Sequence, residues 1–174
     1  ASLGEFEQGR PLIERIRKEH PEYRILQTFF SPSGYEVRKN YQGADIVCYL
    51  PFDTPRNVRC FIEMVNPCMV FFIKYEFWQN YLNTLYKKGI PVYSVSSIFR
   101  PNQIFFRWYG KDYRKVLKTF SHLFVQNEVS EKLLASIGVT DVTIVGDTRF
   151  DRVLDICTVA KDLPLVKAFK GNSK

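Results

Sequence analysis

Short apolar runs alternate with amphipathic stretches along most of the chain, and this alternation predicts strands that alternate with helices. Six runs have the length and composition of strands, at residues 24–30, 46–50, 68–73, 91–95, 123–125 and 142–145. The run Cys-Met-Val-Phe-Phe-Ile at 68–73 is apolar throughout, as is typical of a parallel strand buried on both faces. The pattern therefore predicts an α/β domain with a mainly parallel, Rossmann-like sheet flanked by helices.

Helical patterns fill the intervals between the predicted strands. Thr54 followed by Pro55 fits an N-cap with proline at the first helical position. Gly89 fits the residue after a helix C-terminus, where a left-handed conformation is common. The pattern predicts a short helix after Ser31 and further helices that start at Thr54 and cover residues 79–88, 102–120 and 130–137.

The chain opens on Ala-Ser-Leu-Gly-Glu, a turn that runs into a helical pattern as a loop after a strand does. We expect that first strand to be truncated. Glu5 is a candidate general base, because an ionised carboxylate beside a substrate hydroxyl can accept its proton. Capping of the helix by Glu5 or Glu7 is the alternative, since a helix N-terminus stabilises an anion. Pro11 allows either a helix from about Arg10 or a kinked helix from Glu5.

Polar clusters follow the predicted strands, at the edge where parallel α/β sheets bind their ligands. The segment Ser31-Pro32-Ser33-Gly34 offers hydroxyl and N–H groups to an anion at a helix start, although Ser and Gly at such a place often serve the turn alone. The other clusters comprise Asp53, Thr54 and Arg56, then Lys74, Glu76 and Trp78, then Ser94, Ser96 and Ser97.

The segment Lys74-Tyr75-Glu76-Phe77-Trp78 places a cation, a carboxylate and an indole together after the most apolar strand. One interpretation is a lysine–glutamate pair beside a packing tryptophan. The other is a functional cluster, and we favour it because such a set at a strand end suits a binding face.

Aromatic and basic residues crowd together between residues 98 and 120. Phe105, Arg107 and Trp108 are the candidates for membrane contact, because a basic aromatic helix suits an anionic lipid surface. The same composition suits nucleic acid. A helix with an aromatic core face and a solvated basic face is the third interpretation.

Composition narrows the class of partner. The chain has 174 residues, of which 45% are hydrophobic, so it is long and apolar enough for one packed domain. Its formal net charge of +7 favours an anionic partner. Its 4 cysteines form no Cys-x-x-Cys pair, which disfavours a structural zinc or a disulfide framework and favours a reducing compartment. No metal site is predicted, and no apolar run is long enough to cross a bilayer.

Five motifs in order along the chain resemble the 3-deoxy-D-manno-octulosonic acid (Kdo) transferases of lipopolysaccharide biosynthesis. They are Ala-Ser-Leu-Gly-Glu at 1–5, Phe-Phe-Ser-Pro-Ser-Gly-Tyr-Glu at 29–36, Tyr-Leu-Pro-Phe-Asp-Thr-Pro at 49–55, Lys-Tyr-Glu-Phe-Trp-Gln-Asn at 74–80 and Gly-Asp-Thr-Arg-Phe-Asp at 146–151.

This resemblance implies the N-terminal half of a GT-B glycosyltransferase, which has two Rossmann-like domains facing a cleft. Residues 1–150 are then expected to form the acceptor-binding domain and residues 151–174 the start of a linker. The C-terminal donor domain, which would bind the co-substrate CMP-Kdo, is expected to be absent. The implied reaction is inverting transfer of Kdo to a lipid A precursor, lipid IVA, without a cofactor or a protein-bound metal, and the isolated chain is expected to be inactive.

The resemblance also implies roles for individual residues. Glu5 matches the general base of the family, and Glu76 matches a supporting carboxylate. The residues expected to contact the acceptor are Ser31, Ser33, Gly34, Arg56 and Lys74.

The implied location is the cytoplasmic face of the inner membrane of a Gram-negative bacterium, with peripheral attachment or an anchor outside this sequence. Nucleic acid is not an expected partner of such a transferase. Two alternatives remain: a non-catalytic module that binds anionic membrane or nucleic acid, and another GT-B transferase that acts on a lipid-linked sugar.

Overall fold

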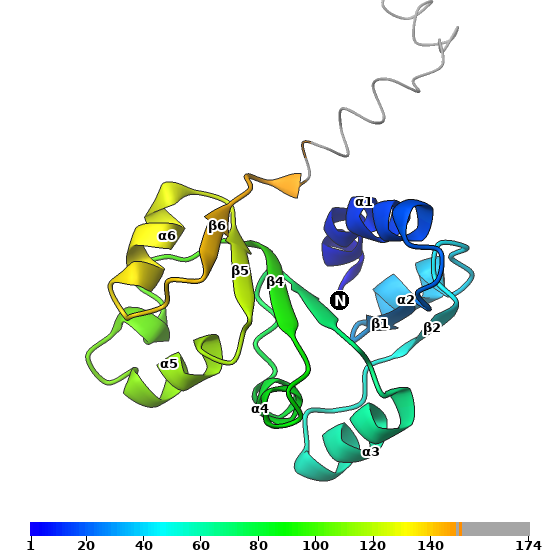
Figure 1. Cartoon of the computed structure of the whole chain (residues 1–174), viewed down its shortest axis with the longest axis horizontal. Coiled ribbons are helices and arrows are strands. Elements are labelled where there is room, and N and C mark those ends of the chain that lie inside the picture. Colours follow the sequence, from blue (N-terminus) through cyan, green and yellow to red (C-terminus); the bar gives the residue numbers. More distant parts are fainter. Residues whose placement is uncertain (149, 151–174) are drawn as a thin grey trace, which may run out of the picture.

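The computed structural model describes residues 1–148 and 150, which form helices and strands in alternation (Figure 1). The helices are α1 (Leu3–Glu19), α2 (Pro32–Arg38), α3 (Pro55–Val65), α4 (Gln79–Lys87), the 3-10 helix η1 (Ile104–Phe106), α5 (Lys111–Leu117) and α6 (Glu128–Ala135). The strands are β1 (Leu26–Phe29), β2 (Ile46–Tyr49), β3 (Val70–Ile73), β4 (Val92–Ser97), β5 (His122–Val125) and β6 (Val142–Ile144). The linker predicted at 151–174 lies outside the described residues.

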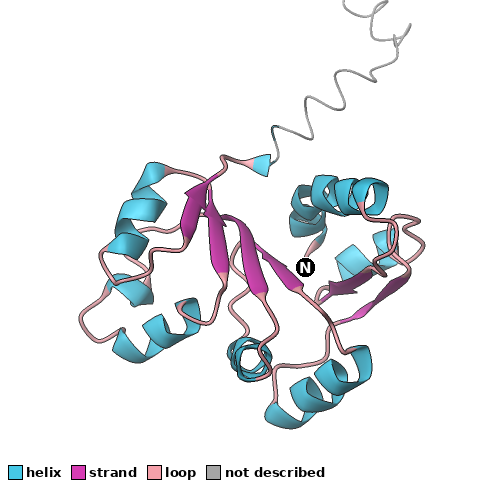
Figure 2. Cartoon of the chain, in the orientation of Figure 1, coloured by secondary structure: helices cyan, strands magenta, loops and turns pink. Residues whose placement is uncertain are grey.

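All strand pairs in the described chain are parallel, which confirms the predicted α/β class. The strands form two sheets, a pair in the order β1-β2 and a larger sheet in the order β3-β4-β5-β6 (Figure 2). Each predicted strand is present, with ends that differ by a few residues. Parallel pairing brings the carboxyl ends of neighbouring strands to a common edge, where the polar clusters of the sequence fall.

Local sequence signals set several helix ends. Thr54 caps α3, and its side chain accepts a hydrogen bond from the N–H of Asn57 at 3.4 Å. Helix α4 ends before Gly89, which has a φ of 68°. Glycine takes this left-handed conformation without the steric cost that a Cβ brings.

The core has two parts. The larger packs α3, α4, α5 and α6 on the four-stranded sheet, and its fully buried side chains include Val58, Leu82, Leu117, Leu123 and Leu134. The smaller joins α1 to the β1–β2 pair through Phe6 and Phe29, whose ring centroids are 5.6 Å apart.

The prediction of one long helix over residues 102–120 is wrong, because η1 and α5 are separate helices joined by a turn. Gly110 is buried in this turn, and a Cβ at Gly110 would lie 1.8 Å from the carbonyl oxygen of Ile104. The side chain of Arg114 donates to the carbonyl oxygens of Phe105 at 2.7 Å and Arg107 at 2.8 Å. The carbonyl oxygens of Phe105 and Arg107 in this turn therefore bond to the Arg114 side chain, and the helix is interrupted.

Ala1 has a strand-like position at the end of β1. Its nitrogen donates to the carbonyl oxygen of Thr28 at 3.1 Å, and its carbonyl oxygen accepts from the N–H of Phe30 at 3.2 Å. These two bonds flank Phe29 in the pattern of a parallel ladder. Helix α1 starts two residues later, at Leu3, and also contacts β3, where a Cβ on Gly9 would lie 3.2 Å from the Ile73 side chain. Helix α1 therefore contacts both sheets near its N-terminal end.

Gly34 allows α2 to approach α1 and β1 closely. A Cβ at this position would lie 2.6 Å from a ring carbon of Phe29 and 3.1 Å from the backbone nitrogen of Leu3. Both neighbours belong to the packed junction, so neither has room to move away.

We predict that Gly34→Ala destabilises the fold by about 1–3 kcal/mol, because overpacking forces the Phe29 ring and the α1 backbone apart. Urea unfolding followed by circular dichroism measures the change. The matched control is Gly4→Ala in the first turn of α1, where a Cβ would meet nothing within 4 Å. This control is expected to be neutral or stabilising by roughly 0.5–1 kcal/mol, since alanine favours helix over glycine. Equal effects of the two substitutions would contradict the close packing at Gly34.

Candidate active site

A cavity of about 410 Å³ opens where α1 begins and where β1 and β3 end. It is lined by Ser2, Glu5, Phe30, Ser31, Tyr75, Glu76, Phe77 and Trp78. Three segments that are distant in the sequence therefore meet there. Two of them follow parallel strands at their carboxyl ends, which is the edge of an α/β sheet that binds ligands.

Glu5 is positioned by the first turn of α1. The Glu5 carboxylate accepts a hydrogen bond from the N–H of Ser2 at 2.6 Å, and the Ser2 hydroxyl accepts one from the N–H of Glu5 at 3.4 Å. This reciprocal capping box fixes both residues. The helix begins at Leu3 and includes Pro11, so the alternative of a start near Arg10 is wrong. Glu5 therefore both caps α1 and lines the cavity.

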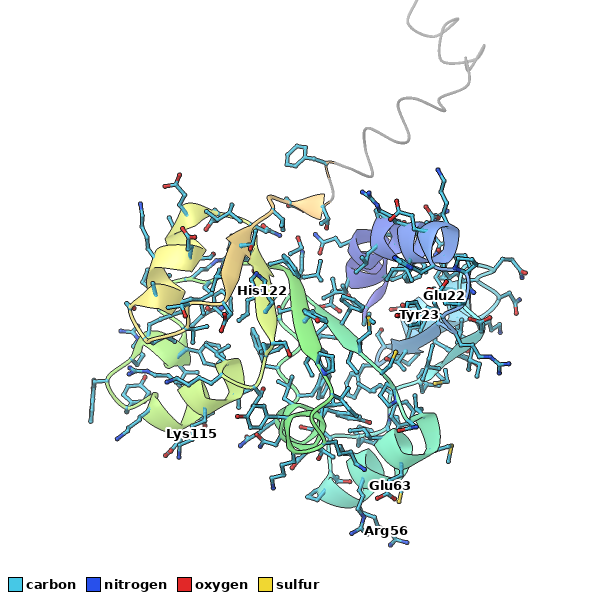
Figure 3. The ribbon with its side chains drawn as sticks, in the orientation of Figure 1. Glu22, Tyr23, Arg56, Glu63, Lys115 and His122 are labelled. Atoms are coloured by element: carbon cyan, nitrogen blue, oxygen red, sulfur yellow. The ribbon has the colours of Figure 1, made fainter. Side chains whose placement is uncertain are left out.

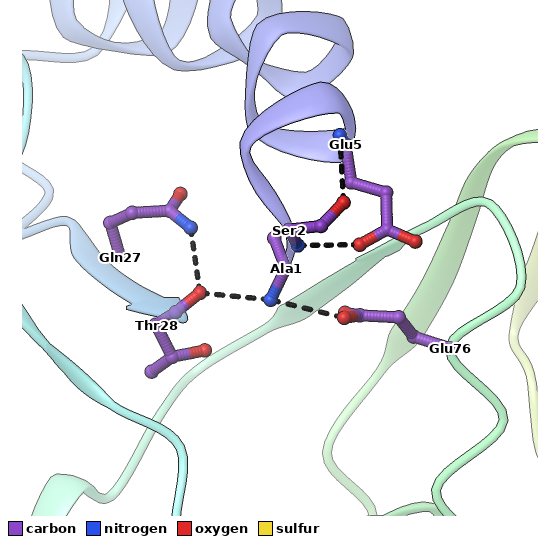
Figure 4. A network of polar contacts seen from close by, with 6 residues as sticks. All are labelled: Ala1, Ser2, Glu5, Gln27, Thr28 and Glu76. Carbon is purple, nitrogen blue, oxygen red and sulfur yellow. Dashed lines mark hydrogen bonds and ion pairs between the residues drawn. The ribbon is translucent and has the colours of Figure 1, made fainter. Parts of the chain in front are cut away.

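Glu76 approaches Glu5 from the segment after β3. Its side chain is only 14% exposed, and its carboxylate lies 3.0 Å from the Ala1 ammonium nitrogen. Burial raises the pKa of Glu76, the Ala1 ammonium lowers it, and the nearby Glu5 carboxyl raises it further, with a net upward shift. Figure 4 shows both carboxyl groups beside Ala1, with the bonds that Ala1 and Ser2 make.

Burial and the neighbouring Glu5 carboxyl both disfavour the charged form of Glu76. Two carboxyl groups side by side in one cavity suit proton transfer to or from a bound molecule.

Aromatic side chains form one wall beside the carboxyl groups. The rings of Phe30 and Trp78 have centroids 4.8 Å apart, and those of Phe30 and Phe52 are 5.8 Å apart. Phe52 is 71% exposed and Phe30 is 42% exposed. An apolar surface thus extends outward from the cavity. The indole nitrogen of Trp78 is buried without a hydrogen-bond partner among the described residues.

The two predicted serines lie together after β1. Ser31 lines the cavity, and its hydroxyl is 2.7 Å from that of Ser33, which is exposed. Gly34 does not line the cavity, because it is buried against Phe29. The structure thus gives Gly34 a packing role in place of the acceptor contact expected from the sequence.

Neither Lys74 nor Arg56 is among the residues that line the cavity. Lys74 begins the turn that carries Glu76, and its backbone is left-handed, with a φ of 59°. Arg56 is exposed on α3 and does not line the cavity. Figure 3 shows Arg56 at the lower edge of the view, away from the first turn of α1. The structure does not bring Arg56 to the other candidate residues.

The three residues predicted to contact a membrane separate in the structure. Phe105 is buried, with its ring centroid 5.3 Å from that of Phe77, so its predicted membrane contact is wrong. Arg107 is exposed, and Trp108 is 90% exposed beside Tyr109. An exposed basic and aromatic patch remains at Arg107, Trp108 and Tyr109.

Two contacts near the cavity were not predicted from the sequence. The carboxylate of Asp53 accepts from the N–H groups of Asn80 at 3.2 Å and Tyr81 at 3.1 Å, which caps α4 beside the cavity. The buried Gln8, one turn after Glu5, donates to Asp147 at 3.3 Å. The second contact brings the Gly-Asp-Thr segment after β6 onto α1. The only feature of the sequence that pointed to Asp53 was its position after β2.

None of the described helices has both the length and the apolar character needed to cross a membrane. Within the same described residues, no cluster of His, Cys, Asp and Glu side chains has the makeup of a metal site.

The fold and the cavity define an α/β domain that gathers carboxyl and aromatic groups at the carboxyl ends of parallel strands. The sequence model of the family described as 3-deoxy-D-manno-octulosonic-acid transferase (kdotransferase) matches residues 1–152. The chain therefore belongs to this family.

Individual relatives carry the same description. The chain is 27% identical to a 3-deoxy-D-manno-octulosonic acid transferase of Haemophilus influenzae over 87% of this chain and 36% of the relative. It is 27% identical to one of Aquifex aeolicus over 97% of this chain and 43% of the relative. A relative from Chlamydia trachomatis is 24% identical over 80% of this chain and 33% of its own length. The chain thus spans less than half the length of these relatives.

Proposed function

We propose that this chain forms the acceptor-binding part of a transferase that moves Kdo from CMP-Kdo to a lipid A precursor, lipid IVA. The observation that carries the proposal is the cavity in which Glu5 and Glu76 meet beside an aromatic wall. Membership of the Kdo transferase family supports the reaction type. The positive charge of the chain supports a phosphorylated acceptor.

Glu5 is the proposed general base. It removes the proton from an acceptor hydroxyl while that oxygen forms a bond to the anomeric carbon of Kdo. The bond from this carbon to CMP breaks at the same time, and CMP leaves with the bonding electrons. Attack opposite to the leaving group inverts the anomeric centre. No protein-bound metal takes part in this scheme.

The surroundings of Glu5 hold it in place for this role. Glu76 lies beside Glu5 in the cavity as the proposed supporting carboxylate. The capping bond from Ser2 fixes the direction of the Glu5 carboxylate.

The residues in and beside the cavity suit a glycolipid. Ser31 offers a hydroxyl to the sugar, and Lys74, at the start of the adjoining turn, offers a cation to a phosphate. Phe30 and Phe52 offer apolar surface to acyl chains. A lipid IVA molecule in the cytoplasmic leaflet of the inner membrane would present these groups together, with CMP-Kdo supplied by a second domain of the transferase.

We predict that Glu5→Gln lowers transfer by about 100-fold or more in a complete transferase containing this chain, as expected for loss of a general base. Glutamine also suits the third position of a capping box, so the helix start and the fold should persist. Release of CMP in the presence of lipid IVA measures the rate.

The matched control for Glu5→Gln is Glu63→Gln, the same chemical change on the exposed surface of α3 (Figure 3). It should leave transfer unchanged. Activity of Glu5→Gln within a few-fold of the parent would exclude Glu5 as the base.

We also propose that the patch of Arg107, Trp108 and Tyr109 contacts the membrane surface. Trp108→Ser is predicted to weaken binding to phosphatidylglycerol vesicles by roughly three- to tenfold, because partial burial of a large side chain contributes on the order of 1 kcal/mol. The melting temperature should stay the same, since Trp108 is 90% exposed. Vesicle sedimentation measures the binding.

Tyr86→Ser on α4 is the control for the vesicle experiment, because Tyr86 is also exposed, at 63%, but lies on another element. Equal loss of binding in both variants would contradict a specific patch. Salt-sensitive binding to single-stranded nucleic acid, without binding to vesicles, would favour the alternative partner.

A further inference from the structure

Two residues other than glycine have a left-handed backbone at neighbouring strand ends. Lys74 directly follows β3 and has a φ of 59°, and Ser96 lies near the end of β4 with a φ of 57°. The pairing of β4 with β5 shifts register between Ser94 and Ser97. A left-handed backbone is strained for residues other than glycine, and it persists where the surroundings impose it.

Side chains of Ser97 and Gln126 form hydrogen bonds with these two residues. Ser97 donates a hydrogen bond to the carbonyl oxygen of Lys74 at 2.9 Å, and its hydroxyl also contacts that of Ser94. The side chain of Gln126 donates to both the carbonyl oxygen and the hydroxyl of Ser96, at 3.0 Å each. Ser94, Ser96 and Ser97 are all 0% exposed. Buried hydroxyls are costly unless they are hydrogen-bonded, so this network is a specific feature of the strand ends.

Lys74 is held on both sides of its Cα atom. Its N–H donates to the carbonyl oxygen of Val95 at 2.9 Å, and its own carbonyl oxygen accepts from Ser97. The chain then turns, with the N–H of Phe77 donating to the carbonyl oxygen of Tyr75 at 3.0 Å. Glu76 lies within this turn, two residues after Lys74. The backbone angles of Lys74 therefore set the direction in which the chain carries Glu76.

We propose that Ser97 is a positioning residue that locks the left-handed conformation of Lys74 and thereby directs Glu76 toward Glu5 and Ala1. The proposal rests on the proposed function only in treating the cavity as catalytic. Ser97 does not line the cavity and acts through the backbone of β3 and the turn after it.

The test compares Ser97→Ala with Ser121→Ala in this chain. Ser121 is the matched control, because its hydroxyl accepts from the N–H of Val92 at 3.2 Å, at the opposite end of β4. Each variant removes one hydroxyl bonded to a backbone group. The readout is the titration midpoint of the Glu76 carboxyl by ¹³C NMR, with urea unfolding as a measure of stability.

Ser97→Ala is expected to lower the midpoint of Glu76 by about half a pH unit or more, as the released turn lets water reach the carboxyl and separates it from Glu5. Ser121→Ala is expected to leave that midpoint in place. A Ser97→Ala chain that folds with an unmoved Glu76 midpoint would overturn the proposal, whatever its loss of stability.

A second pair of variants keeps the test informative if Ser97→Ala unfolds. Glycine adopts the φ of Lys74 without strain, so Ser97→Ala should cost less stability in a Lys74→Gly background than in the parent. Equal costs in the two backgrounds would overturn the proposal. Because neither experiment involves sugar transfer, its result is independent of whether the chain acts on Kdo.

Discussion

The candidate site depends on the junction at which Ala1 joins three elements of the fold. Its main chain bonds to Thr28 and Phe30 at the end of β1, and its nitrogen lies 3.0 Å from the carboxylate of Glu76 after β3. The first turn of α1 follows at once and carries Glu5. The two sheets are therefore connected at the place where the carboxyl groups meet. If α1 moved relative to the end of β3, Glu5 and Glu76 would separate.

Close packing and local capping make this junction rigid. The capping box between Ser2 and Glu5 fixes the first turn of α1. Because Gly34 has no Cβ, α2 packs against this turn and against Phe29 without a clash. On the other side, buried hydroxyls hold the turn of Lys74. Each carboxyl is thus presented by backbone that is hydrogen-bonded or packed, which is what a site with a defined proton-transfer geometry requires.

Much of this fold was predictable because short-range signals agree with it. Apolar runs marked each strand, and Thr54 and Gly89 marked helix ends. The long helix at 102–120 was wrong because Gly110 serves a buried turn that depends on Ile104, and Phe105 packs into a core that forms only in three dimensions. In the candidate site, Glu5, Glu76 and Ser31 follow from their places after strands. The positions of Gly34, Arg56 and Lys74 outside the cavity lining, and the buried network at Ser97, depend on contacts between distant segments.

The central claim is that Glu5 and Glu76 share one site, so that the Glu5 carboxyl raises the pKa of Glu76. The most direct measurement is the pKa of Glu76 in the parent chain and in Glu5→Gln, read from the ¹³C shift of the Glu76 carboxyl. The account predicts a raised pKa in the parent and a lower one in the variant, because the Glu5 carboxyl is one of the causes of the upward shift. A pKa of Glu76 that is the same in both chains would contradict the shared site.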